Sequence, residues 1–401
     1  MTVHTAATNT TSAYGWVERA FHWSIAVLIV TAFVLGNLAY DAPFDTDAAL
    51  AQKAWLFSFH KTVGVTIFFV ALARIFWAIS QPRPRPLHGG IEGFLAGAVH
   101  WLLYGSLVLV PLLGWSEHAA TTGFAPIWWP FGQTLPFVPQ DAELAARLAV
   151  LHTTFVKVLA AAVILHVLGA IKHVVIDRDQ TMARMWRGTD PGPLAQARGH
   201  VLPLGAAALV WLATFGVGMV LTPHGASIAA PTEAAQVDGV ANWEVTEGTL
   251  SITVAQLGSP VTGTFGDWQA AIDFDEAARA DGTHGTVEVA ISTGTLTLGS
   301  VTPQATSSDF LSSVDFPTAT FAGVIRSEGE GYVAEGPLTI RGVEVPLVLP
   351  FTLAIDGDVA TMAGQVALDR RDFGMGETYP DESSVGFAVT VDVALIAQRT
   401  P

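Results

Sequence analysis

The chain has 401 residues, of which 51% are hydrophobic and 13% are charged, about half the charged share of a typical soluble domain. Residues 1–223 carry a net charge of +2 and residues 224–401 a net charge of −18, which predicts a domain boundary near residue 224. The acidic half excludes non-specific nucleic-acid binding, and the absence of cysteine excludes disulfides, thiolate zinc sites, iron–sulfur clusters and covalently attached haem.

Five apolar stretches in the first half are long enough to cross a membrane, which takes about 20 helical residues. We predict transmembrane helices at residues 17–39, 59–79, 94–115, 151–175 and 201–221. The first stretch lacks the basic flank, the short apolar run and the cleavage site of a signal peptide, so we expect it to be retained.

The charges of the connecting segments predict the orientation of these helices. The segments after the second and fourth spans are basic, whereas those after the first and third spans are acidic. Because basic loops stay in the cytoplasm, we expect a cytoplasmic N-terminus. The fifth span then delivers everything after residue 222 to the opposite side.

A tether and a β domain follow the fifth span, which we place at residues 199–222. Residues 223–240 are small and polar and have no periodicity, which predicts a linker. In residues 241–397, apolar and polar residues alternate and turn residues recur, so we predict seven or eight antiparallel strands in a barrel or a sandwich. A closed barrel of this size can hold a small apolar ligand, and its single histidine, His284, argues against metal or histidine chemistry there.

The fourth span carries His152 and His166, 14 residues apart. This spacing is about 40° short of four full turns and about 21 Å in length, so both rings lie on one face, one near each membrane surface. His22 in the first span matches the depth of His166, and His60 in the second span matches the depth of His152.

Paired histidines inside a membrane indicate a function, because an imidazole there is costly without a partner. Two pairs at two depths fit two haems with two axial histidines each, whereas zinc prefers three or four ligands. For any one of these residues, a helix cap or a hydrogen bond across the bundle is the simpler interpretation. His100, in the third span, is a rival ligand, and we interpret His118 as a loop or interface residue.

Two lysines accompany the outer pair. Lys61 adjoins His60, and Lys157 lies inside the fourth span, where an unpaired ammonium is costly. We expect both lysines to neutralise haem propionates. The alternative is that Lys61, with Lys53 and Arg147, forms a positive mouth that attracts a small anion.

The motifs around these histidines resemble the bacterial cytochrome b561 family over residues 14–190. The matching strings are Arg19-Ala-Phe-His22-Trp23, His60-Lys61-Thr-Val-Gly64, His100-Trp-Leu-Leu-Tyr104 and His152…His166-Val-Leu-Gly-Ala-Ile-Lys172-His173. The resemblance implies two haem b groups in a multi-pass protein of the bacterial inner membrane. It implies His22 and His166 as iron ligands on the cytoplasmic side, His60 and His152 as iron ligands on the periplasmic side, and His173 near a ubiquinone-type quinone. Some family members resemble superoxide:quinone oxidoreductases.

Residues 241–397 are similar to the YceI-like family of lipocalin-like barrels that bind polyisoprenoid chains. The matching strings are Gly263-Thr-Phe265, Phe316-Pro317-Thr-Ala-Thr-Phe321, Gly336-Pro-Leu338-Thr-Ile-Arg341-Gly342 and Arg371-Asp-Phe373-Gly374. The resemblance implies an isoprenoid lipid or quinone inside a periplasmic barrel. The strongly acidic composition of this region, with one histidine and no lysine, departs from the family pattern.

The fold class that follows is a membrane all-α four-helix di-haem bundle and a fifth transmembrane helix, followed by an all-β antiparallel lipocalin-like barrel. We expect electron exchange between the quinone pool and a periplasmic partner or small oxidant, and we assign no catalytic residue. Two alternatives remain open. One is an isoprenoid-binding protein whose helices are an anchor, and the other is a haem b anchor subunit of a separate dehydrogenase.

Overall fold

The computed structural model describes residues 3–121, 124–191, 194, 199–222, 237, 239, 241–329 and 331–400. The chain divides into two compact units, and we describe the helical and the strand-rich parts separately. Of the predicted linker at 223–240, only Val237 and Gly239 are among the described residues, so the linker remains a prediction.

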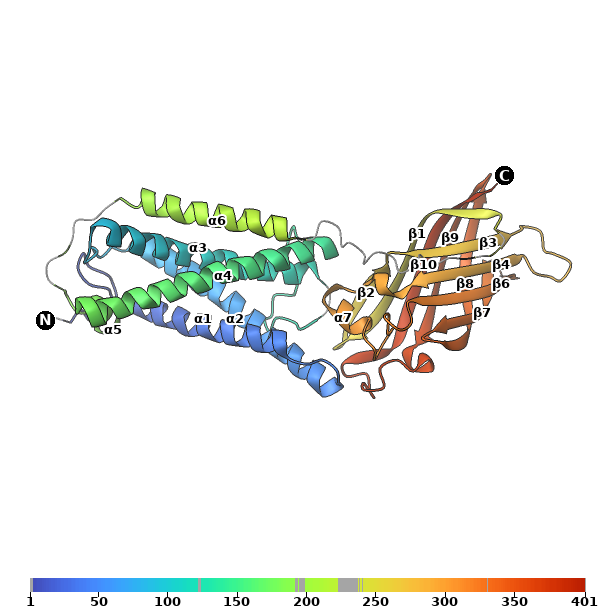
Figure 1. Ribbon diagram of the computed structural model, residues 1–401, viewed down its shortest axis with the longest axis horizontal. Coiled ribbons are helices and arrows are strands. Elements are labelled where there is room, and N and C mark those ends of the chain that lie inside the picture. The colour runs from blue at the N-terminus through green and yellow to red at the C-terminus, as the bar shows by residue number, and fades with distance from the viewer. Residues whose placement is uncertain are drawn as a thin grey trace. The chain divides into compact units, whose positions relative to one another are not determined.

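Among the described residues, five helices are long and apolar enough to cross a membrane, as the sequence predicts. They are α1 (Trp16–Asp41), α2 (Asp47–Ser80), α3 (Gly90–Ala120), α4 (Ala142–Lys172) and α6 (Val201–Leu221) (Figure 1). Helix α2 begins at Asp47, well before the predicted start at 59. Helix α4 continues into a π-helix, η1 (His173–Asp177), and a short helix α5 (Thr181–Arg187) follows.

Apolar side chains hold the bundle together in two clusters. Ile25 and Ile29 of α1 pack with Val63 and Ile67 of α2. In the second cluster, Val110 of α3 packs against three side chains of α4, which are Leu151, Phe155 and Leu159. The two clusters therefore pack histidine-bearing helices against one another, α1 against α2 and α3 against α4.

Helix α6 packs directly on the bundle along α3 and α4 (Figure 1). Gly105 of α3 leaves room for the indole of Trp211, which a Cβ at that position would overlap. A Cβ at Gly218 of α6 would lie 2.6 Å from Leu151. Small residues let membrane helices approach closely enough for dispersion forces to hold them together, so the fifth helix is part of the bundle as well as the link to the second domain.

Ten strands follow in the described part of the chain, all antiparallel. They are β1 (Trp243–Gln256), β2 (Ser259–Phe265), β3 (Trp268–Phe274), β4 (Gly285–Ser292), β5 (Leu296–Thr297), β6 (Thr318–Glu328), β7 (Gly331–Ile340), β8 (Val343–Asp356), β9 (Val359–Asp369) and β10 (Val385–Arg399).

The strands close into a barrel rather than forming a sandwich. The order β10-β9-β8-β7-β6-β4-β3-β1 returns to its start because β1 also pairs with β10, over most of the length of both strands. Strands β2 and β5 extend the sheet beyond β1. The predicted antiparallel lipocalin-like barrel is confirmed, and the structure settles the strand number of the closed ring at eight. Closure leaves its interior walled by apolar side chains from alternate positions.

Candidate functional site

His60 of α2 and His152 of α4 face each other across the bundle. Their ring centres lie 6.4 Å apart, with the planes at 85°. A metal held by both rings through bonds of about 2 Å to nitrogen needs ring centres about 6 Å apart. The pair therefore has the separation that one iron between two imidazoles requires.

Each of these two rings is fixed by a backbone carbonyl of a neighbouring helix. Nδ1 of His60 donates to the carbonyl of Ala32 at 2.9 Å, and Nδ1 of His152 donates to the carbonyl of Val110 at 3.0 Å. A carbonyl only accepts, so the proton is on Nδ1 and the lone pair is on Nε2. This tautomer leaves Nε2 as the nitrogen available to a metal, and the outer hydrogen bond raises its basicity.

A glycine one helical turn after each of these carbonyls makes room for the ring. A Cβ at Gly36 would lie 2.9 Å from Cε1 of His60, and a Cβ at Gly114 would lie 2.9 Å from Cε1 of His152. Real Cβ atoms do not approach other atoms so closely, so both positions exclude a side chain. The α1–α2 and α3–α4 pairs thus repeat one arrangement of carbonyl, glycine and histidine.

His22 of α1 and His166 of α4 form a second pair, with ring centres 5.9 Å apart. His100 of α3 lies nearer to His166, with ring centres 5.2 Å apart and Nδ1 bonded to the carbonyl of Ala96 in its own helix. The structure thus brings together the predicted pair and its predicted rival. The separation of His22 and His166 is within 0.5 Å of that of the other pair, which suits the same kind of metal group.

The two lysines predicted near the outer pair differ in their surroundings. Nζ of Lys61 lies 3.2 Å from Nδ1 of His118, whose Nε2 donates to Gln133. His118 is buried in the last turn of α3. The sequence interpretation as a loop or interface residue is therefore wrong as far as the loop is concerned. Lys157 is exposed on α4. The predicted contact of both lysines with propionates or anions stays a prediction.

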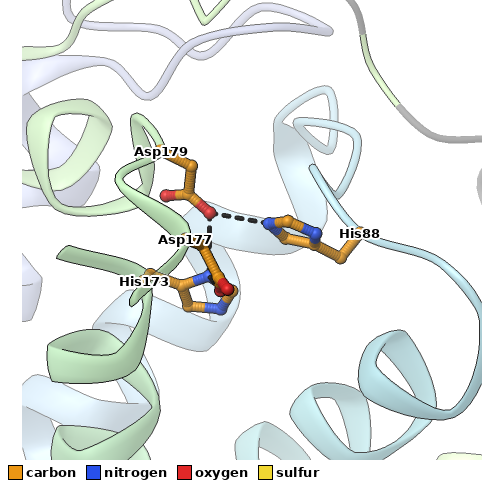
Figure 2. A group of neighbouring side chains, drawn as sticks. All are labelled: His88, His173, Asp177 and Asp179. Atoms are coloured by element: carbon orange, nitrogen blue, oxygen red, sulfur yellow. Dashed lines mark hydrogen bonds and ion pairs between the residues drawn. The ribbon is translucent and has the colours of Figure 1, made fainter. Parts of the chain in front are cut away.

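A polar cluster, defined as His88, His173, Asp177 and Asp179, lies at the opposite end of the bundle (Figure 2). Oδ2 of Asp179 accepts hydrogen bonds from Nε2 of His88 at 2.6 Å and from Nδ1 of His173 at 2.8 Å. Burial favours the protonated form of Asp179, but the hydrogen bonds from His88 and Thr181 outweigh burial and lower the pKa of this carboxyl to about 2. The carboxylate is thus ionised between two imidazoles.

The polar cluster depends on a rare backbone conformation. The chain leaves α4 as a π-turn over His173–Asp177, and Arg178 takes a left-handed conformation with φ at 50°. These turns carry Asp179 back toward His173. Single π-helical turns are found mostly at functional sites, and apart from the position of His173 no sequence pattern predicts this one.

The barrel encloses a cavity of about 280 Å³, lined almost wholly by apolar side chains. Gln256 and Gln304 lie in its wall, and both are buried. Nε2 of Gln256 donates to Oε1 of Gln304, and Nε2 of Gln304 donates to the hydroxyl of Tyr379. Oε1 of Gln256 finds no partner in the described part of the chain, which leaves one buried acceptor in an apolar wall.

Arg370 is the cation among the described residues that line the cavity, and it is 2% exposed. Its five N–H groups all donate to backbone carbonyls, those of Gly386, Met375, Gly376, Tyr379 and Val385. Arg370 therefore ties the segment before β10 together, and it has no donor left to bind a charged headgroup.

The facing histidines and the closed, apolar-lined barrel define the class of protein. It is a membrane helix bundle with paired histidines suited to bind a metal group, joined to a lipocalin-like barrel. Residues 13–188 match the family model for prokaryotic cytochrome b561, and residues 242–397 match the model for the YceI-like domain. Both predicted resemblances are confirmed. The first family implies haem b as cofactor, and the donor set of facing, carbonyl-fixed imidazoles fits that group.

Two relatives match the helical domain. The chain is 29% identical to cytochrome b561 homolog 2 of Escherichia coli over 188 residues, which is 44% of this chain and 93% of that protein. It is 25% identical to the probable superoxide oxidase CybB of Yersinia pestis over 179 residues, which is 43% of this chain and 94% of that protein.

Two solved structures match the barrel. Burkholderia cenocepacia BcnA is 28% identical, with 38% of this chain and 96% of that chain covered and a TM-score of 0.35. The YCEI protein of Campylobacter jejuni is 20% identical, with 35% and 85% covered and a TM-score of 0.30.

Proposed function

We propose that this protein is a di-haem b-type cytochrome of the bacterial inner membrane, linked to the quinone pool. His22 and His166 bind one haem on the cytoplasmic side, and His60 and His152 bind the other on the periplasmic side. A haem held by two histidines would supply one-electron transfer at each of these places. The barrel is periplasmic and binds an isoprenoid lipid or quinone.

The observation that carries this proposal is the geometry of His60 and His152, whose rings are held at the separation and in the tautomer that one metal ion between them requires. Their ring centres are 6.4 Å apart, carbonyls hold both protons on Nδ1, and glycines make room for both rings. Placing two imidazoles inside a membrane bundle without a partner is costly. Helices that served only as an anchor would gain nothing from this arrangement.

Quinone reacts beside His173, which follows His166 by two helical turns. Reduction to quinol takes up two electrons and two protons, so the site needs a proton path as well as a nearby haem. Nδ1–H of His173 is bonded to Asp179, which also accepts from His88. The side chain of His88 is 33% exposed, so this hydrogen-bonded series leads from solvent to the quinone.

The electron donor on the outer side is a small reductant such as superoxide, or a protein partner. Two superoxide ions would each lose one electron and become dioxygen, and the two electrons would reduce one quinone at the other side. Lys61, held beside His118 next to His60, supplies positive charge where a small anion would approach. Electron flow in the opposite direction uses the same residues.

Among isoprenoid lipids and quinones, the barrel suits best a ligand whose neutral head carries a hydroxyl group. Gln256 Oε1 offers an acceptor without a partner, and Arg370 has no free N–H for a phosphate. An unmatched buried acceptor costs about 1–3 kcal/mol, which a hydroxyl donor in the cavity would remove. A quinol or a prenyl alcohol meets this requirement, whereas a polyprenyl phosphate does not.

The decisive experiment is a count of haem in the purified, full-length protein by pyridine haemochrome. We expect two haem b groups per chain, and one after His60→Leu or His152→Leu. His22→Leu and His166→Leu should remove the other haem, while His100→Leu should keep both. A colourless protein from cells well supplied with haem would overturn the cytochrome proposal, and loss of haem in His100→Leu but not in His22→Leu would replace His22 by His100.

Two further measurements separate the proposal from its alternatives. Lipids extracted from the full-length protein and identified by mass spectrometry should include an isoprenoid, and Ala319→Phe, which fills the cavity wall, should reduce its amount. Quinone reduction by the protein alone, with superoxide supplied, favours the proposed oxidoreductase. Activity only with a co-purified dehydrogenase would show an anchor subunit instead.

A further inference from the structure

The polar cluster brings together four side chains that can bind a metal ion, and none of them is a proposed haem ligand (Figure 2). They are His88, His173, Asp177 and Asp179. One possible ligand atom from each side chain lies within 4.8 Å of the other three. The four residues come from the loop before α3, from η1 and from the turn that follows it. Figure 2 shows both rings turned toward the Asp179 carboxylate.

The ligand atoms are already close to the spacing that a metal ion needs. Nε2 of His88 and Nδ1 of His173 lie 2.6 and 2.8 Å from the same oxygen of Asp179, and Nδ1 of His173 lies 3.0 Å from Oδ2 of Asp177. Ligands of a tetrahedral zinc ion lie about 3.4 Å apart. The four atoms lie within 4.8 Å of one another, so entry of an ion requires the most distant pair to close by up to about 1.4 Å.

The carboxylate of Glu92 lies near the ring nitrogens of His88 and His173 that do not face Asp179. Oε2 of Glu92 lies 3.8 Å from Nδ1 of His88, and Oε1 of Glu92 lies 3.9 Å from Nε2 of His173. These are the two nitrogens that would carry the ring protons once the other nitrogens bind an ion. Histidines that bind metals almost always donate their other N–H to such an acceptor, which fixes their orientation.

The remaining charges also suit a divalent ion. Two carboxylates and two neutral imidazoles sum to a charge of −2. Lys172 contacts both Asp177 and Glu92, so it can stay on Glu92 when Asp177 turns to an ion. The backbone N–H of Thr181 holds the other oxygen of Asp179 at 2.7 Å, which keeps this carboxylate in place.

We propose that His88, His173, Asp177 and Asp179 bind one divalent transition-metal ion with the preferences of Zn²⁺, and that Glu92 orients the two histidines. Two imidazole nitrogens favour Zn²⁺ or Ni²⁺ over Mg²⁺ and Ca²⁺, which prefer oxygen. Binding moves the proton of each ligating nitrogen to the nitrogen that faces Glu92. The site shares His173 with the proposed quinone site, so a bound ion competes with proton delivery there.

Zinc binding is measured on the full-length protein with the affinity tag removed, by equilibrium dialysis against buffered Zn²⁺ and elemental analysis. We expect about one zinc ion per chain, unaffected by excess Mg²⁺. Asp179→Asn and His88→Gln should abolish binding, and Glu92→Gln should weaken it about 10- to 100-fold. The matched control is Asp190→Asn, because Asp190 bonds to Ser12 outside the cluster.

Haem content and spectrum, measured on the same samples, report whether each variant is folded. Absence of zinc from a correctly folded wild-type protein at micromolar free Zn²⁺ would overturn the proposal, as would undiminished zinc in a folded His88→Gln, Asp179→Asn double variant. Because the readout is zinc content, it does not depend on quinone activity. Failure of the quinone proposal would leave this result unchanged.

Discussion

Gly114 of α3 faces the imidazole of His152 in α4 so closely that a Cβ would lie 2.9 Å from both Cε1 and Nδ1. The same relationship joins Gly36 to His60. Because the carbonyl of Val110 fixes the ring of His152, the ring cannot yield to a methyl group without breaking that hydrogen bond. The glycine therefore determines where the ring stands.

Gly114→Ala should accordingly displace the ring of His152. The protein should then lose the haem that we propose His60 and His152 bind. We expect the haem count to fall from two toward one per chain, with the spectrum of the other haem retained. Gly205→Ala on α6 is the control, because a Cβ there meets nothing within 4 Å. Equal haem in the two variants would show that the close approach does not position the ring.

The ion pair between Glu18 of α1 and Arg74 of α2 is a second target. The guanidinium of Arg74 lies 3.1 Å from the carboxylate of Glu18. The side chain of Arg74 is 11% exposed and that of Glu18 is 5% exposed. Removing one partner of a buried pair leaves an uncompensated charge and costs about 3–5 kcal/mol. Arg74→Leu should thus lower the thermal midpoint of the detergent-solubilised protein markedly.

The matched variant is the double change Glu18→Leu, Arg74→Leu, which removes both charges. It should recover much of the lost stability, because replacing a buried pair by apolar side chains is often neutral. A double variant no more stable than Arg74→Leu would show that an uncompensated charge on Glu18 is not what destabilises the single variant.

Docking of α6 depends on Gly105, which leaves room for the ring of Trp211. Gly105→Val should force the indole away and break its hydrogen bond to Ser106. We expect a lower thermal midpoint and readier cleavage of the chain near residue 222 by added protease. Gly216→Ala on α6, where a Cβ meets nothing within 4 Å, should behave like the wild type, and similar losses in both variants would contradict specific docking.

Gln256→Leu tests the headgroup proposed for the barrel ligand. One net hydrogen bond is worth about 0.5–1.5 kcal/mol, so the affinity for an isoprenoid quinol should fall roughly 2- to 10-fold. Affinity for the matching quinone, which has no hydroxyl, should change little or rise. Anaerobic competition between the two forms on the full-length protein measures this, with exposed Gln269→Leu on β3 as the control. Equal losses for both ligands would argue against a hydroxyl at Gln256.

Much of the fold could be predicted because it rests on local patterns. An apolar run of about 20 residues must become a helix in a membrane, so the five spans follow from composition alone. Alternation of apolar and polar residues likewise predicts the strands. The shared face of His152 and His166 follows from helix geometry, and motif resemblance points to His22, His60 and His173.

Contacts between segments that lie far apart in the chain could not be predicted from the sequence. Barrel and sandwich differ only in whether β1 meets β10, and no local pattern records that pairing. The sequence predicts His118 as a loop or interface residue, and only the packed structure places it in α3 beside Lys61 and Gln133. The meeting of His88 with Asp179, and the unmatched acceptor of Gln256, likewise depend on which segments the tertiary structure brings together.

The sequence by itself therefore determined the helices, the strands and the histidines that share a helix face, because these depend on spacing along one element. Only the tertiary structure decided which ring meets which partner, since side chains far apart in the chain come within bonding distance only once the elements pack.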